Sequence, residues 1–139
     1  MQIYRLKSPL WLQQSKKKRF SLNLNIYRNA HHRVSNSMKI KYKQLMSNQI
    51  SKLPVFPDQI LIMYVVYPKT KRKFDLGNVC SIHDKFFCDA LVEHGKITDD
   101  DYTFIPEIRY RMGEVDKLNP RVEILIKPVK EHPNVRNHT

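Results

Sequence analysis

The sequence is poor in residues that several kinds of binding site require. It has only three glycines among 139 residues, so no glycine-rich loop that cradles nucleotide phosphates can form. Its two cysteines, Cys80 and Cys88, lack the CxxC spacing of a zinc site, and on one helix they would lie about 12 Å apart, too far for a disulfide. We therefore expect two reduced cysteines and neither a kinase nor an ATPase.

Long apolar runs are also missing. No stretch reaches the roughly 18 apolar residues of a membrane span, and the N-terminal segment lacks the continuous apolar core of a signal peptide. We therefore expect an intracellular protein without membrane contact.

Acidic residues are absent from residues 1–57. This segment holds 12 of the 25 Lys and Arg residues, whereas residues 58–139 hold 13 basic and all 13 acidic residues, so the net charge of +12 arises in the first half. Such an excess indicates a polyanionic partner, nucleic acid foremost. Seven of the acids fall within residues 75–101. A basic surface beside an acidic pocket suggests an enzyme that acts on nucleic acid with a metal held by carboxylates.

Hydrophobic periodicity predicts a single α/β domain with the order β-α-β-α-β-β, in which two helices flank a mixed sheet of about four strands. The expected strands are residues 20–26, 59–67, 104–112 and 121–127, and the expected helices are residues 31–53 and 79–94. Residues 1–19 are expected to form a basic tail and residues 130–139 a frayed C-terminus. The start of the second helix stays open, because Asp75 can cap it, whereas the turn-prone pair Gly77-Asn78 can keep residues 75–78 in a loop.

Residues near this second helix could carry chemistry. Lys85 and Asp89 are spaced i, i+4 at the border of its apolar face, where a lysine can neutralise a phosphate beside a carboxylate; a surface ion pair is the alternative. The strongly basic residues 69–73 lead directly into Asp75, so a phosphate contact and a carboxylate would be neighbours. The plain structural alternatives are a helix cap for Asp75 and a polar turn for residues 99–101.

The stretch KFDLGNVCSIHDKFFCDALVEHGKITDDDYTF resembles the signature of the RusA family of Holliday junction resolvases. The likeness lies in an Asp-x-x-Asn element, a helix with Lys four residues before Asp, and a glycine followed by paired Asp; FSLNLNIYRNAH and VDKLNPRVEI extend it over residues 20–126. This resemblance implies a small α/β homodimer of a phage or prophage, acting in the cytoplasm of a bacterial host. It also implies cleavage of four-way DNA junctions in recombination and repair, by paired symmetric nicks with Mg²⁺ held by aspartates.

Residue by residue, the resemblance assigns Asp75 and Asn78 to the first element, Lys85 and Asp89 to the helix, and Asp100 to the later aspartate pair. The sequence departs from the family at Gly77, where the second acid falls, and the spacing from Asn78 to Lys85 is about one helical turn longer.

We expect the site to combine Asp75, Asp89 and Asp100, with Asp99 as a neighbour. On a straight helix Asp75 and Asp89 would lie about 21 Å apart, so a shared site requires residues 75–78 to fold back as a loop. Asp84 is a reserve ligand on the opposite side of the helix from Asp89.

The expected function is that of a Mg²⁺-dependent, structure-selective endonuclease, with Mn²⁺ as another possible cation. The candidate catalytic residues are Lys85, Asp75 and Asp100, and the candidate metal ligands are Asp75, Asp89, Asp99 and Asp100. The candidate DNA contacts are Arg28, Lys71, Arg72 and Lys73. Two alternatives remain open: a non-catalytic, basic nucleic-acid-binding protein, and an RNA nuclease with the same metal chemistry.

Overall fold

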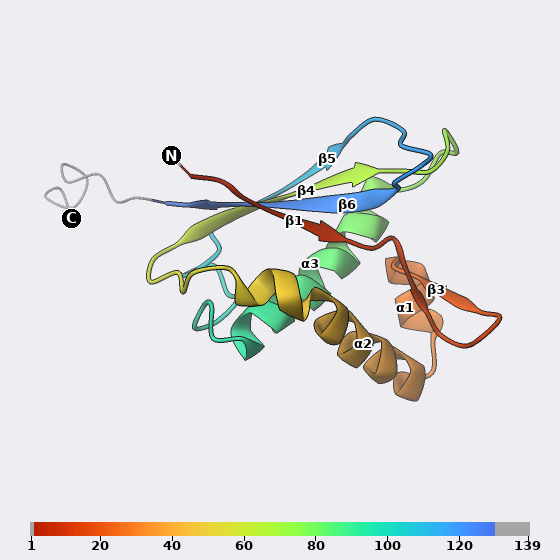
Figure 1. Ribbon diagram of the computed structural model, residues 1–139, viewed down its shortest axis with the longest axis horizontal. Coiled ribbons are helices and arrows are strands. Elements are labelled where there is room, and N and C mark those ends of the chain that lie inside the picture. The colour runs from red at the N-terminus through yellow and green to blue at the C-terminus, as the bar shows by residue number, and fades with distance from the viewer. Residues whose placement is uncertain (1, 130–139) are drawn as a thin grey trace, which may run out of the picture.

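A four-stranded mixed sheet forms the framework of the protein. The computed structural model describes residues 2–129. In the sheet, β1 (Tyr4–Ser8), β6 (Arg121–Pro128), β4 (Ile60–Tyr67) and β5 (Glu107–Met112) follow one another in this order (Figure 1). β6 is antiparallel to both β1 and β4, whereas β5 is parallel to β4. The predicted mixed α/β fold with a four-stranded sheet is confirmed.

Three helices cover one face of this sheet (Figure 1). They are α1 (Leu24–Asn29), α2 (His32–Ser51) and α3 (Leu76–Glu93). α3 connects the parallel strands β4 and β5, which need a crossover connection of this kind. The sequence predicted α2 and α3 but not the short α1. None of the helices within residues 2–129 combines the length and the apolar character that crossing a bilayer demands.

The core lies between the sheet and these helices. β4 is the apolar run predicted as a central strand, and it is flanked by hydrogen-bonded neighbours on both sides. Alternate residues of β4 and β6 point into the core: Ile60, Ile62, Tyr64, Val66, Val122, Ile124 and Ile126. This period of two is the expected result of strand geometry, since successive side chains point to opposite faces.

The N-terminal segment differs from its prediction. Residues 2–19 do not form a tail, because β1 pairs with β6 along its whole length and β2 (Trp11–Gln13) forms a hairpin with β3 (Arg19–Ser21). The predicted strand over residues 20–26 is wrong beyond Ser21: Asn23 accepts a hydrogen bond from the backbone N–H of Asn25 (2.9 Å) and so caps α1. The prediction for residues 130–139 lies outside the described residues.

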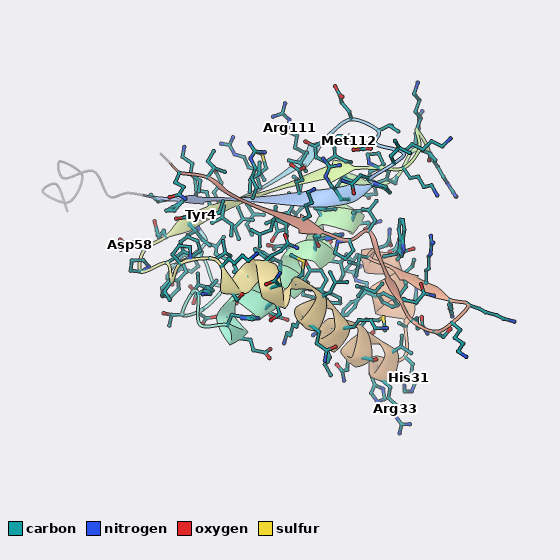
Figure 2. All side chains as sticks on the ribbon, in the orientation of Figure 1. Tyr4, His31, Arg33, Asp58, Arg111 and Met112 are labelled. Atoms are coloured by element: carbon teal, nitrogen blue, oxygen red, sulfur yellow. The ribbon has the colours of Figure 1, made fainter. Side chains whose placement is uncertain are left out.

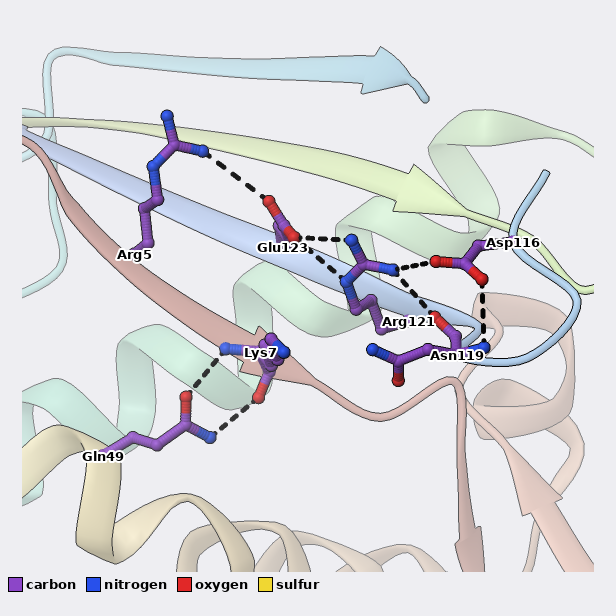
Figure 3. Close-up of polar contacts among 7 residues, drawn as sticks. All are labelled: Arg5, Lys7, Gln49, Asp116, Asn119, Arg121 and Glu123. Atoms are coloured by element: carbon purple, nitrogen blue, oxygen red, sulfur yellow. Dashed lines mark hydrogen bonds and ion pairs between the residues drawn. The ribbon is translucent and has the colours of Figure 1, made fainter. Parts of the chain in front are cut away.

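Polar contacts fasten β1 to its neighbours (Figure 3). Gln49 of α2 binds both backbone groups of Lys7: it accepts from the N–H (2.8 Å) and donates to the carbonyl oxygen (2.9 Å). On the outer face of the sheet, Glu123 pairs with Arg121 (2.8 Å) and lies 3.7 Å from Arg5 of β1. These contacts tie an edge strand to both α2 and β6.

A buried polar network joins β1, α2 and α3. The Ser8 hydroxyl oxygen lies 2.7 Å from the Tyr42 hydroxyl and 2.7 Å from His83 Nδ1. His83 is fully buried, and its Nε2 has no hydrogen-bond partner among the described residues. Because burial removes the hydration of the charged imidazolium, it lowers the pKa of His83 to about 3. The folded protein therefore keeps this ring neutral.

We expect the free energy of unfolding to fall as the pH drops from about 6.5 toward 3, because the unfolded chain protonates His83 in this window and the folded protein does not. The unfolded state then binds more protons, so acid favours unfolding. Urea unfolding at a series of pH values measures the effect, and the pH dependence should be smaller in His83→Gln. An NMR titration in which the folded His83 ring protonates near pH 6.5 would contradict this expectation.

Candidate functional site

α3 determines where the predicted site residues lie. It runs without a break from Leu76 to Glu93, and Asp75 is its N-cap. The Asp75 carboxylate accepts hydrogen bonds from the backbone N–H groups of Gly77 (2.9 Å) and Asn78 (3.4 Å), which have no partners within the helix. Of the two alternatives that the sequence leaves open, Asp75 as the helix cap is the one observed, so residues 75–78 do not fold back as the loop that a site shared within one chain requires.

Gly77 adjoins this cap. A Cβ atom at position 77 would lie 3.3 Å from Asp75 Oδ1, so an acidic side chain there would begin beside the Asp75 carboxylate. No acidic residue occurs in the first turn of α3. The start of α3 therefore carries one exposed carboxylate, that of Asp75.

Asp89, Asp99 and Asp100 are neighbours at the other end of α3. Gly95, with a φ of 70°, ends the helix in a left-handed conformation, and the turns that follow bring the aspartate pair toward Asp89. The backbone N–H of Asp100 donates to Asp99 Oδ1 (2.7 Å). Partial burial, the adjacent Asp99 and the negative charge of Asp89 raise the pKa of Asp100. Three of the four predicted metal ligands therefore share one region.

Asp75 does not join this group within one chain. Fourteen positions separate it from Asp89, which corresponds to about 21 Å along the axis of an uninterrupted helix. Within residues 2–129, no three His, Cys, Asp or Glu side chains form a group that could hold a metal ion. A single chain in this conformation therefore does not fit a Mg²⁺ ion held jointly by the four predicted ligands.

Lys85 lies on the exposed side of α3, next to α1. Its Nζ is 5.8 Å from the centre of the Tyr27 ring, and Nζ of Lys39 from α2 approaches the same ring at 5.9 Å. The ion pairs of the described residues do not include one between Lys85 and Asp89. Lys85 is thus an exposed cation between the two ends of the helix where the aspartates lie.

Asp84 belongs to a half-buried cluster under the sheet that the sequence analysis did not recognise. Its Oδ1 accepts hydrogen bonds from the Tyr64 hydroxyl (2.8 Å) and from the Cys88 thiol (3.3 Å), while burial raises its pKa. Cys80 and Cys88 are free, as predicted, and burial raises the pKa of Cys80 to about 12. The i, i+4, i+8 spacing of Cys80, Asp84 and Cys88 was the available signal, because it places all three on one side of a helix.

The predicted DNA contacts lie on two neighbouring segments. Lys71, Arg72 and Lys73 are exposed in the loop of residues 69–73, hereafter the basic loop, and Arg28 is exposed on α1. A groove of about 560 Å³, the loop groove, separates the basic loop from the segment that joins β3 to α1. The polar and charged residues that line it are Ser21, Asn23, Lys69, Thr70, Arg72 and Lys73. Asp75 follows Lys73 after one intervening residue, at the end of this cationic surface.

Comparison with known proteins assigns no family. No protein-family model matches the chain, and no curated protein matches it. The resemblance to the RusA family stays a prediction that depends on the motif residues of positions 75–101.

The cap at Asp75 can be tested separately from any activity. Asp75→Ala should lower the free energy of unfolding by about 1 kcal/mol, because two backbone N–H groups lose their acceptor. Asp75→Asn keeps a capping oxygen and should change it by less than about 0.5 kcal/mol. Urea unfolding of both variants measures the difference, and equal losses would contradict the capping role.

Proposed function

We propose that the protein is a metal-dependent endonuclease that cuts branched DNA, four-way junctions in particular. The observation that carries this proposal is the position of Asp75 beside the basic loop. A phosphate bound by Arg72 or Lys73 would lie within reach of the Asp75 carboxylate, because the two positions from Lys73 to Asp75 span at most about 7 Å and the three from Arg72 at most about 11 Å. Carboxylates next to a bound phosphodiester are the setting in which metal-dependent hydrolysis occurs.

A second copy of the chain is part of this proposal. β5 is an edge strand, and all six of its residues are exposed. Ile108, Tyr110 and Met112 keep 40%, 40% and 46% of their surface exposed; Figure 2 shows Met112 and Arg111 at this open edge. Because an open edge with apolar side chains can pair with another strand, we infer that the homodimer forms through β5.

The charges of β5 favour an antiparallel pair. With the two-fold axis at Arg109, Glu107 of each copy lies opposite Arg111 of the partner subunit, and Ile108 lies opposite Tyr110 of the partner subunit. Opposite charges and apolar residues that face each other across two strands both stabilise the pair. The same register keeps the apolar residues of both copies on the side of the sheet that the helices cover.

This arrangement would also bring the separated aspartates together. α3 runs antiparallel to β4 and β5, since it connects two parallel strands. A two-fold axis perpendicular to the sheet therefore sets the two α3 helices antiparallel on one face, with the Asp75 end of each directed toward the Asp89 end of the other. We propose that Mg²⁺, or Mn²⁺ in its place, is held between Asp75 of one copy and carboxylates from the Asp89, Asp99 and Asp100 region of the other, because those three acids do not form a metal-binding group within one chain.

Lys85 and the basic loop complete the proposed roles. Lys85 lies between the aspartates of the two helix ends, where its charge can offset that of the scissile phosphate. Arg28, Lys71, Arg72 and Lys73 contact the DNA backbone, which makes binding dependent on salt. A protein with this activity acts in the cytoplasm of a bacterial host, as the product of a phage or prophage.

The alternative function is nucleic-acid binding without catalysis. It is favoured by Gly77 at the position of the family's second acid and by the separation of the aspartates in one chain. An RNA nuclease is the other rival. Incubation of the protein with a labelled four-way junction, a linear duplex and a structured RNA, each with and without Mg²⁺, distinguishes all three.

The shared site predicts complementation between inactive variants. Asp75→Asn and Asp100→Asn should each abolish cleavage alone, whereas a heterodimer of the two contains one complete site. After subunit exchange, the mixture should therefore nick one strand of the junction without paired cleavage. Denaturing gels of strand-specifically labelled junctions measure this result.

A mixture of Asp89→Asn with Asp100→Asn is the matched control. Both substitutions lie at the same end of α3, so each of the two sites in that heterodimer lacks one ligand. This mixture should therefore not nick the junction. If the wild-type protein is active but the mixture of Asp75→Asn and Asp100→Asn stays inactive, the site is not shared between two copies. If the wild-type protein cleaves none of the substrates with Mg²⁺, the proposal that it is a nuclease is refuted.

A further inference from the structure

We propose that a second groove, on the side of α1 away from the basic loop, binds an unpaired nucleic-acid strand; this inference depends on the proposed action on nucleic acid. The groove, hereafter the hairpin groove, has a volume of about 620 Å³. It lies between the β2–β3 hairpin, α1 and the start of α2. Most of the hairpin falls within the segment that the sequence predicted to be a basic tail.

The hairpin groove is cationic. All its lining residues belong to positions 14–34, where no Asp or Glu occurs. Lys18 and Arg19 of the hairpin form one rim, and His31 at the start of α2 lies on the other. Figure 2 shows His31 and Arg33 together at this end of the molecule. Lys18, Arg19 and Arg33 belong to no ion pair of the described residues, so their charges are available to phosphate groups.

The inner surface of the hairpin groove is apolar. Phe20, Ala30 and Val34, which are buried or half-buried, contribute to it together with the exposed Ile26, whereas the charged Lys18 and Arg19 are exposed. Unpaired bases bind proteins through their flat faces, whereas a duplex keeps those faces stacked inside and presents phosphates outward. An apolar surface between cationic rims therefore suits a base with its phosphates at the edges, and the volume lies within the range of about 300–1,000 Å³ that compact organic ligands fill.

The position of the hairpin groove fits a strand that leaves a branch point. Ile26, 42% exposed on α1, lines both the hairpin groove and the loop groove. A strand whose phosphates contact Lys69, Arg72 and Lys73 can therefore pass over α1 and place its unpaired end against the hairpin. The two grooves then form a path that a branched substrate, with strands that separate from their partners, can occupy.

Arg19 links this groove to the only tryptophan of the chain. Its guanidinium carbon lies 4.5 Å from the centre of the Trp11 ring. A phosphate that binds Arg19 changes the charge above this ring, so the fluorescence of Trp11 reports on occupancy of the hairpin groove.

The test compares two variants that change the net charge equally. Asn29→Glu places a carboxylate in the hairpin groove, and Gln44→Glu places one on the exposed side of α2 outside it; both positions are exposed. The probes are fluorescein-labelled oligo(dT), oligo(rU) and a blunt DNA duplex, measured by anisotropy with EDTA present so that no cleavage occurs. Circular dichroism and thermal unfolding verify that both variants fold.

We expect Asn29→Glu to bind the single strands about fivefold more weakly than Gln44→Glu does, because the new charge repels phosphates close to it. Duplex affinity should be equal in the two variants, and the change in Trp11 fluorescence should reach its midpoint at an about fivefold higher oligonucleotide concentration in Asn29→Glu than in Gln44→Glu. The ratio of oligo(dT) to oligo(rU) affinity identifies DNA or RNA as the preferred strand. In Lys18→Ala/Arg19→Ala, log affinity against log salt should be less steep by about 1.4, since each phosphate contact contributes about 0.7 for single strands.

Equal single-strand affinities of Asn29→Glu and Gln44→Glu would overturn the inference, and so would an unchanged salt dependence in the Lys18→Ala/Arg19→Ala variant. Either result leaves the nuclease proposal intact, because that proposal depends on cleavage and on the aspartates. Conversely, a protein that never cleaves but shows the fivefold difference refutes the nuclease and supports the groove.

Discussion

The packing of α3 between the sheet and α2 is the interaction on which the rest of the structure depends. Its buried residues include Cys80, Phe87 and Leu91, and Phe86 meets Tyr42 of α2 edge to face with ring centres 5.5 Å apart. Side-chain burial on this scale, rather than helix propensity, stabilises a helix of 18 residues. A helix packed along its whole length cannot bend to bring its two ends together, so its length separates Asp75 from the aspartates beyond its C-terminal end.

The acid-free first half of the chain supplies both framework and charge. β1 and α2 contribute buried residues such as Leu6, Met38 and Tyr42, while the cations of the same segment point outward. Only two of its basic residues, Arg5 and Lys43, belong to ion pairs within the described residues. The excess charge is therefore left on the surface, where it disfavours the compact state through self-repulsion and favours association with a polyanion. This balance explains why the β2–β3 hairpin and α1 offer two grooves free of carboxylates.

The sequence predicted the elements whose apolar pattern is strong and local. α2, β4 and β6 matched their predictions closely, because apolar residues that recur with a period of 3.6 indicate a helix and those that recur with a period of 2 indicate a strand. β1 was missed because its partner β6 is more than a hundred residues away, and one of its buried positions is Ser8, whose polarity is satisfied only by Tyr42 and His83 in the folded core. The sequence left the start of α3 open because Gly77 is also common in turns. In the structure, the hydrogen bonds from the backbone N–H groups of Gly77 and Asn78 to Asp75 begin the helix at Leu76. The same cap explains why the expected four-aspartate site could not be placed correctly from spacing alone.

The acidic residues near the C-terminal end of α3 lie where the helix itself disfavours them. Backbone carbonyl groups give that end a partial negative charge, and no basic residue occurs in the last turn. Lys43 pairs with Glu93, yet the ion pairs of residues 2–129 give no cation to Asp89, Asp99 or Asp100. Helix stability therefore does not account for this cluster. A positive charge from outside the chain would lower the electrostatic energy of this aspartate cluster. A divalent cation could supply it, and so could the partial positive charge at the N-terminus of α3 in a second copy. β5 begins at Glu107, seven positions after Asp100, so the exposed edge strand follows the uncompensated charge closely along the chain.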